Sequence, residues 1–148
     1  MICRWAYPPP YEIYNWKSWE QLLEGGEEFA DPGIRESQYR SVLDEQGELA
    51  GFAQLFPITG VTRLGLGLRP DLCGAGLGAA FVEAIAQEAL RLNPGNEIDL
   101  EVLTSNTRAI RTYHRAGFRI TDTYKRMTPR GPDQFHCMVW SGKASSQP

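Results

Sequence analysis

Three glycines occur within five residues near the middle of this 148-residue chain. They stand between a segment with the alternation of a strand and a segment whose apolar residues recur at helical spacing. Such a turn directs unpaired backbone N–H groups, together with the positive end of the following helix, at one point. It favours an anion such as a diphosphate, although glycine-rich turns also simply precede helices. The residues of the turn are Cys73, Gly74, Ala75, Gly76, Leu77 and Gly78.

The same glycines also fit a dinucleotide-binding fingerprint. Gly74, Gly76 and Ala79 have its spacing, and an acidic residue, Glu97 or Asp99, follows about 20 residues later. That fold requires two βαβ halves, however, and only one such unit is visible here. The remaining segments are typical of hairpins, so the sequence disfavours a dinucleotide site.

A second pattern follows in the run Asn106-x-x-Ala109-x-x-x-Tyr113-x-x-x-Gly117-Phe118. Residues at positions i, i+3 and i+7 share one face of a helix, so Asn106, Ala109 and Tyr113 should line one side. Alone, the pattern is typical of a capping asparagine and a core tyrosine. Combined with the glycine turn, the pattern favours a helix face that takes part in a functional site.

The elements that position these residues follow from hydrophobic periodicity. The predicted strands are residues 39–43, 49–56, 62–68, 98–103, 119–127 and 134–140, and the predicted helices are residues 18–23, 77–92 and 107–116. Strand 62–68 alternates leucine with glycine, which predicts a close neighbour on its bare face. We expect a single α/β domain over residues 1–140, with an aromatic-rich entry segment at 1–37, one parallel βαβ unit and a disordered tail at 141–148.

Composition narrows the function classes. A formal net charge of −3 and the absence of a Lys/Arg-rich run disfavour nucleic acid as a partner. The longest apolar runs are far shorter than a membrane-spanning helix, and the start lacks a secretory signal, so we expect a cytoplasmic protein without a membrane partner. The scattered cysteines Cys3, Cys73 and Cys137 have no metal-binding spacing, which predicts reduced thiols and no metal.

The order of these elements resembles the GNAT N-acetyltransferase superfamily over roughly residues 39–140. The resemblance implies a GNAT-like fold, with a central, mostly antiparallel twisted sheet of about six strands and helices on both faces. It also implies acetyl-CoA as cosubstrate, with its pantetheine paired to the backbone at Leu66 and Leu68 and its pyrophosphate on the turn from Cys73 to Gly78. The bare face at Gly65 and Gly67 would then have an occupant.

The resemblance also implies direct attack of an amine on the thioester. Tyr113 looks like the acid that protonates the leaving thiolate, a role that suits a phenol with an ordinary pKa near 10. Asn106 resembles the residue that hydrogen-bonds the pantetheine arm, and Ala109 lies on the same helix face. Glu101 stands where the ribosomal-protein alanine N-acetyltransferases have their proposed base, while a solvated or salt-bridged carboxylate is an equal interpretation. His114 and His136 are weaker candidates for the base.

The chain departs from the family at two places. Cys73 and Ala75 replace turn residues that are commonly basic, so that Arg69, Arg108 or Arg111 would have to supply charge. The start also has no room for the family's first strand. The acceptor is expected to be a primary amine on a small molecule or a protein, with a homodimer as one option for assembly. The alternative is a non-catalytic acyl-CoA-binding or partner-binding module.

Overall fold

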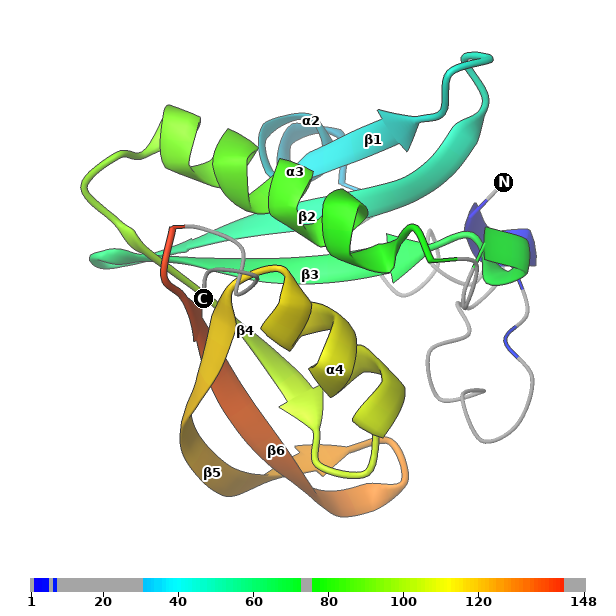
Figure 1. Cartoon of the computed structure of the whole chain (residues 1–148). Coiled ribbons are helices and arrows are strands. Elements are labelled where there is room, and N and C mark those ends of the chain that lie inside the picture. The colour runs from blue at the N-terminus through cyan, green and yellow to red at the C-terminus, as the bar shows by residue number, and fades with distance from the viewer. Residues whose placement is uncertain (1, 6, 8–30, 73–75, 143–148) are drawn as a thin grey trace. The chain divides into compact units, whose positions relative to one another are not determined.

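A computed structural model describes residues 2–5, 7, 31–72 and 76–142 of the chain (Figure 1). The predicted helix at 18–23, turn residues Cys73, Gly74 and Ala75, and most of the predicted tail lie outside the described residues. The described elements are η1 (Ile2–Arg4), α2 (Pro32–Gln38), β1 (Tyr39–Leu43), β2 (Leu49–Ile58), β3 (Val61–Leu68), η4 (Pro70–Leu72), α3 (Gly78–Leu92), β4 (Glu97–Leu103), α4 (Thr107–Arg115), β5 (Phe118–Thr128) and β6 (Gly131–Trp140).

The strands belong to one six-stranded sheet with the order β1-β2-β3-β4-β6-β5. β3 and β4 are parallel, whereas β4 with β6 and β5 with β6 are antiparallel. The predicted mixed, mostly antiparallel α/β fold with one parallel pair is therefore confirmed. Two compact units make up the chain, one from Met1–Gln54 and Leu66–Ala75, the other from Leu55–Gly65 and Gly76–Pro148.

In the first unit, β1 pairs with the first half of β2, from Tyr39 opposite Gln54 to Leu43 opposite Leu49. Its core is aromatic, since the rings of Trp5 and Phe52 lie 6.3 Å apart and both residues are buried. A Cβ at Gly67 would lie only 2.0 Å from Cε1 of Phe52. The bare face of β3 predicted from sequence is therefore filled at Gly67 by a core ring of the same unit, not by a bound molecule.

In the second unit, a parallel ladder joins β3 to β4 from Val61 opposite Glu97 to Leu64 opposite Leu100. α3 makes the connection between these strands, as the helical spacing predicted. Its buried residues and the alternate residues of β4 form a core with α4, β5 and β6. That core comprises Leu64, Val82, Ile85, Ala86, Ala89, Ile98, Leu100, Val102, Ala116, Phe118, Met138 and Trp140.

The closing hairpin is tighter than the sequence predicted. We expected a loop at 128–133, but the β5–β6 ladder continues to Thr128 opposite Gly131. Gly131 adopts a φ of 108°, and the Thr128 hydroxyl donates to its carbonyl at 2.8 Å and to Asp133 at 2.9 Å. The two prolines in this segment suggested a long loop, but Pro132 lies opposite Met127 within the ladder.

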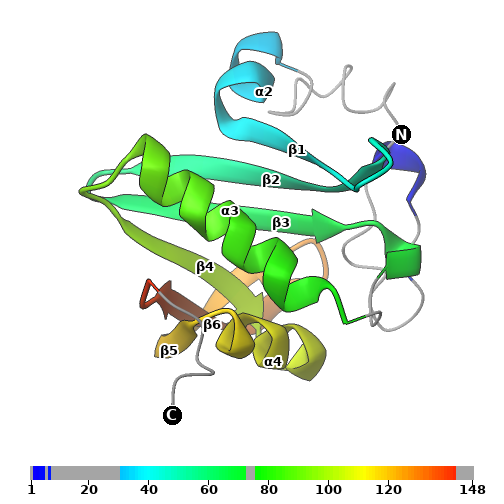
Figure 2. The ribbon, with the colours of Figure 1, turned by 45° about the horizontal axis from the view of Figure 1, so that its top comes forward.

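The two faces of the sheet in this unit differ in chemistry. Figures 1 and 2 show α3 and α4 on the same side of β4 and β6. Because side chains alternate along a strand, Leu100 and Val102 of β4 face these helices, whereas Asp99 and Glu101 face the opposite side. A polar face is thus built behind the hydrophobic layer that carries the helices.

Candidate active site

The described part of the glycine turn has the backbone conformation expected of an anion cradle. Gly76 adopts a φ of 82°, which a residue with a side chain rarely adopts, and a Cβ there would meet nothing within 4 Å. Leu77 is the N-cap of α3 and makes no side-chain capping hydrogen bond. Leu77 therefore offers no side-chain acceptor to the first-turn N–H groups of α3, which suits a diphosphate oxygen.

Gly78 brings the start of α3 against α4. A Cβ at Gly78 would lie 2.8 Å from Cγ2 of Thr112, so only a glycine fits without movement. The Thr112 hydroxyl donates to the carbonyl of Arg108 at 3.1 Å, which holds this side chain along α4. The glycine turn and α4 are thus locked together by direct packing.

α4 carries the second sequence pattern as expected. Asn106 is its N-cap, and the Asn106 side chain accepts a hydrogen bond from the N–H of Ala109 at 3.2 Å. Tyr113 is half-buried, and its ring lies 6.2 Å from that of Phe118 at an interplanar angle of 57°. The indole N–H of Trp140 donates to the carbonyl of Ala116 at 2.9 Å and anchors the end of α4 to β6. Capping and packing roles therefore coexist with any role in a site.

The remaining predicted cofactor residues, Leu66 and Leu68, lie on the part of β3 that belongs to the first unit. The carbonyl of Leu68 accepts a hydrogen bond from the Tyr7 hydroxyl at 2.9 Å. Arg69, a predicted source of charge, instead pairs with Asp71 at 2.6 Å and donates to the carbonyl of Leu49 at 3.0 Å. The side-chain hydrogen bond to Asp71 raises the pKa of Arg69.

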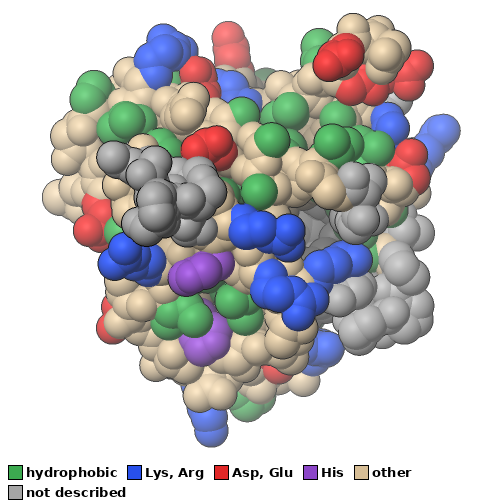
Figure 3. All heavy atoms as spheres, in the orientation of Figure 1, with side chains coloured by type: hydrophobic (Ala, Val, Ile, Leu, Met, Phe, Trp, Pro, Cys, Tyr) green, Lys and Arg blue, Asp and Glu red, His purple; other side chains and the backbone are tan. Residues whose placement is uncertain are grey.

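Positive charge in the second unit gathers on α4. Figure 3 shows Lys and Arg side chains over this helix on the face in view. The α4 sequence contributes Arg108, Arg111 and Arg115, and no acidic residue occurs between Glu101 and Asp122. Arg108 is one helical turn before Thr112, the residue that touches Gly78. Arg108 and Thr112 therefore share one face of α4.

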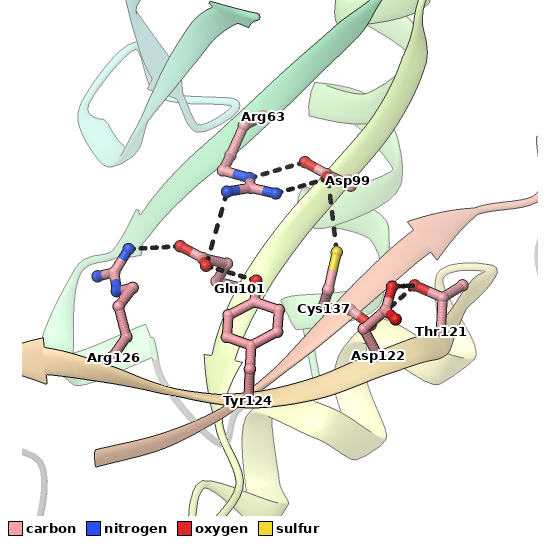
Figure 4. Close-up of polar contacts among 8 residues, drawn as sticks. All are labelled: Arg63, Asp99, Glu101, Thr121, Asp122, Tyr124, Arg126 and Cys137. Carbon is pink, nitrogen blue, oxygen red and sulfur yellow. Dashed lines mark hydrogen bonds and ion pairs between the residues drawn. The ribbon is translucent and has the colours of Figure 1, made fainter. Parts of the chain in front are cut away.

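Glu101 lies in a hydrogen-bonded cluster on the polar face (Figure 4). Its Oε1 accepts from Arg126 Nη1 at 2.5 Å, and its Oε2 accepts from the Tyr124 hydroxyl at 2.5 Å. Arg63 Nη1 stands 3.6 Å from the same Oε2. Glu101 is therefore salt-bridged, one of the two interpretations left open by the sequence, and its side chain is only 11% exposed.

Asp99 anchors the inner end of this cluster. Its carboxylate receives two hydrogen bonds from Arg63, at 3.0 and 2.9 Å, and the Cys137 thiol donates to it at 3.5 Å. The hydrogen bond to Asp99 raises the pKa of Arg63, which stays cationic. Burial raises the pKa of the Cys137 thiol, and burial with the Glu101 hydrogen bond raises the pKa of Tyr124. The cluster thus holds two guanidinium groups, two carboxylates and two neutral donors.

Sequence reasoning did not find this cluster beyond Glu101. Arg63 comes from β3, whereas Tyr124 and Arg126 come from β5, and only the sheet register brings them to Glu101 on β4. The one available signal was the alternation of Asp99 with Glu101, because two acidic residues on one face of a strand need cationic partners.

The two histidines lie elsewhere. His136 is opposite Val102 on β6, and hence on the helix-bearing face, where its Nδ1 is 2.8 Å from the Thr123 hydroxyl. His114 is exposed in the last turn of α4. Glu101 and Tyr113 themselves lie on opposite faces of the sheet.

Residues 2–5, 7, 31–72 and 76–142 include neither a membrane-spanning helix nor a metal-binding cluster. No helix there reaches the length and apolar character required to cross a membrane. That part of the chain also contains no group of three or more His, Cys, Asp or Glu side chains arranged to hold a metal ion.

Comparison with known proteins identifies the family. Residues 1–118 match the model of the acetyltransferase (GNAT) family. A search of curated proteins finds no match. Among solved structures, a chimera of the spermidine N-acetyltransferase SpeG from Vibrio cholerae and hSSAT is similar, with a TM-score of 0.67, 18% identity, and coverage of 88% of this chain and 79% of that one.

A second similar structure is the ribosomal-protein-S18-alanine N-acetyltransferase from Escherichia coli, with a TM-score of 0.57, 23% identity, and coverage of 75% of this chain and 74% of that one. A dodecameric spermidine N-acetyltransferase from Vibrio cholerae has a TM-score of 0.65 at 17% identity and covers 86% of this chain and 76% of that one. These likenesses show the fold, and the family model covers most of the sequence. The chain therefore belongs to the GNAT acetyltransferase family.

Proposed function

We propose that this protein is a cytoplasmic N-acetyltransferase that moves the acetyl group of acetyl-CoA to a primary amine. The observation that carries the proposal is the junction of α3 and α4. There, Gly76 has a positive φ, α3 begins without a side-chain cap, and Gly78 packs on the helix that bears Asn106 and Tyr113. This junction supports a diphosphate site on the helix pair that also carries the Tyr113 phenol.

The residues present fit acetyl-CoA. The N–H groups at the start of α3 suit the pyrophosphate, together with the predicted contacts of Cys73, Gly74 and Ala75. Arg108 and Arg111 of α4 supply the positive charge that the turn lacks. Leu66 and Leu68 would pair with pantetheine through their backbone, and Asn106 and Ala109 would contact it from α4. Acetyl-CoA supplies an activated thioester.

The reaction requires two proton movements. The acceptor arrives as an ammonium and loses one proton to become a nucleophile, for which Glu101 is the proposed base. The C–N bond then forms as the C–S bond breaks, and the Tyr113 hydroxyl gives its proton to the departing sulfur. The second ammonium proton leaves to solvent, and the Tyr113 phenolate takes up a proton from solvent. The products are an N-acetyl amine, CoA and one released proton.

The proposed acceptor is an amine of the kind that the similar proteins are named for. The similar structures carry the names of a spermidine and a ribosomal-protein alanine N-acetyltransferase, which makes both small-molecule and protein amines reasonable acceptors. One spermidine N-acetyltransferase is dodecameric, so a homodimer or larger assembly is compatible with the fold. A non-catalytic acyl-CoA-binding module is the alternative that experiment must exclude.

The test measures CoA release from acetyl-CoA over a panel that includes spermidine and an alanine-initiated peptide. Tyr113→Phe should lower kcat about 10²- to 10⁴-fold while acetyl-CoA affinity, measured by calorimetry, stays within twofold. Tyr39→Phe is the matched control, because Tyr39 packs against Phe52 in the first unit. Tight binding without turnover on the whole panel would favour the module, and full activity in Tyr113→Phe would remove that residue from the mechanism.

A further inference from the structure

We infer that Oε1 of Glu101 is the cation-binding point for the acceptor, that Arg126 of the same chain occupies it at rest, and that the acceptor's ammonium displaces this arginine. The inference deepens the proposed function and rests on it for the identity of the arriving cation. It starts from the contacts of the two oxygens of Glu101. Arg126 holds Oε1, while Tyr124 and Arg63 hold Oε2 (Figure 4).

The partners of Oε2 are fixed from other directions. Arg63 makes two hydrogen bonds to Asp99, whose side chain is 7% exposed, so its guanidinium is committed to a buried partner. Tyr124 is half-buried and donates its only hydroxyl proton to Glu101 at 2.5 Å. Displacing either group would leave a buried donor or acceptor unsatisfied, which is costly. An arriving ammonium therefore does not compete for Oε2.

Arg126 is held differently. Its side chain is 53% exposed, against 11% for Glu101, and it reaches the cluster from the sheet-edge strand β5. The arginine end of this ion pair is in contact with water, and its long side chain can return to solvent. The Arg126 guanidinium also lies 4.7 Å from the centre of the Phe135 ring, a contact that does not depend on Glu101. Among the partners of Glu101, Arg126 is the one that can leave.

The charges of the cluster specify what replaces it. The cluster is neutral at rest, because the carboxylates of Asp99 and Glu101 balance the guanidinium groups of Arg63 and Arg126. Cys137 lies opposite Glu101 on β6 and stays a neutral thiol, since burial raises its pKa. Departure of Arg126 leaves one uncompensated negative charge at Oε1. A single primary ammonium restores neutrality, whereas a neutral or anionic group does not.

Displacement would place the ammonium nitrogen on the oxygen that accepts its proton, so recognition and proton removal use the same atom. Arg126 then acts as a specificity-determining residue, because only an amine that is cationic at neutral pH exchanges with it. Because the acceptor competes with Arg126, its apparent dissociation constant is raised by a factor that the free energy of the Arg126–Glu101 ion pair sets. For an ion pair that is half exposed on the arginine side only, we take the upper end of the range for surface pairs, about fivefold.

The experiment titrates ethylammonium chloride into the full chain and follows the ¹³Cδ resonance of Glu101, assigned with Glu101→Gln. We expect Arg126→Gln to tighten ethylammonium binding about fivefold. Arg130→Gln is the matched control, because Arg130 lies in the same hairpin, is 51% exposed and pairs with Asp133 rather than Glu101. Both variants remove one positive charge, so that a change confined to Arg126→Gln reports the local exchange.

The inference is wrong if Arg126→Gln binds ethylammonium no more tightly than the wild type, or if both arginine variants gain affinity equally. It is also wrong if ethylammonium shifts the Glu101 resonance in neither the wild type nor Arg126→Gln. Thermal melts confirm that each variant is folded before titration. Turnover is measured separately, with Glu101→Gln. Ethylammonium binding at Glu101 without acetyl transfer would refute the proposed function but not the exchange, and acetyl transfer that is unaffected by Glu101→Gln would refute the role of Glu101 as base.

Discussion

The contact between Gly78 and Thr112 makes a sharp prediction, because it joins the glycine turn to the helix that carries Tyr113. Gly78→Ala adds a methyl group that would lie 2.8 Å from Cγ2 of Thr112, against an ordinary contact of at least 3.4 Å. The shortfall is 3.4 − 2.8 = 0.6 Å. Either α3 and α4 separate by that amount, or Thr112 rotates and loses its hydrogen bond to the Arg108 carbonyl.

The expected cost is that of overpacking a close interface, about 1–3 kcal/mol in the free energy of unfolding. The higher helix propensity of alanine offsets at most about 1 kcal/mol of it. Thr112→Ser removes the clashing methyl group and leaves the hydroxyl 3.5 Å from the new Cβ, an ordinary contact. Gly78→Ala should therefore cost much less in the Thr112→Ser background, with a coupling energy of about 1–2 kcal/mol.

Urea denaturation of the wild type, both single variants and the double variant measures this coupling. Gly95→Ala is the control, because a Cβ at Gly95 meets nothing within 4 Å and its φ is not positive; it should be neutral or slightly stabilising. Acetyl-CoA affinity should fall in Gly78→Ala and recover in the double variant. A coupling energy below about 0.5 kcal/mol would refute the packing of α3 on α4 described above.

Two further predictions concern the charges of α4 and the buried thiol. Arg108→Gln with Arg111→Gln should weaken the binding of CoA and of dephospho-CoA, which keeps the pyrophosphate, about tenfold each; an unchanged affinity for dephospho-CoA in calorimetry would contradict a pyrophosphate contact. Because the pKa of Cys137 is raised in the folded protein, the unfolded chain loses this proton first, and stability should fall as pH rises above about 8.5. Cys137→Ala should flatten that fall by up to about 1.4 kcal/mol per pH unit, and an unchanged slope in denaturation at pH 8–10 would contradict it.

Segments with a strong local signal were predicted well. The helix predicted at 77–92 is α3 (Gly78–Leu92), and the strand predicted at 98–103 is β4 (Glu97–Leu103). Their apolar spacing is regular, and Asn93 and Pro94 mark the boundary between them. α2 (Pro32–Gln38) was missed, although Asp31 caps it with two hydrogen bonds to backbone N–H groups. Its seven residues include none that is buried, so hydrophobic periodicity had nothing to detect.

Local patterns left open the features that depend on contacts between distant residues. Local alternation indicated that Gly67 needed a close neighbour, but it could not indicate that the neighbour is the ring of Phe52. Arg69, one of the predicted sources of charge, donates to the carbonyl of Leu49, a contact across 20 residues of chain that no local pattern indicates. The assigned roles of Tyr113, Glu101 and the cofactor-binding residues stay predictions, and the experiments above test them.

The sequence by itself determined the order of the elements, the family they resemble and the glycine positions of the turn, because turn geometry and helical periodicity are set by neighbouring residues. Only the tertiary structure decided the chemistry around Glu101. The register of β4, β5 and β6 brings Tyr124 and Arg126 to it across 23 and 25 residues of chain. A carboxylate's partners depend on which strands are adjacent and on which face each side chain points, and neither is a local property of the sequence.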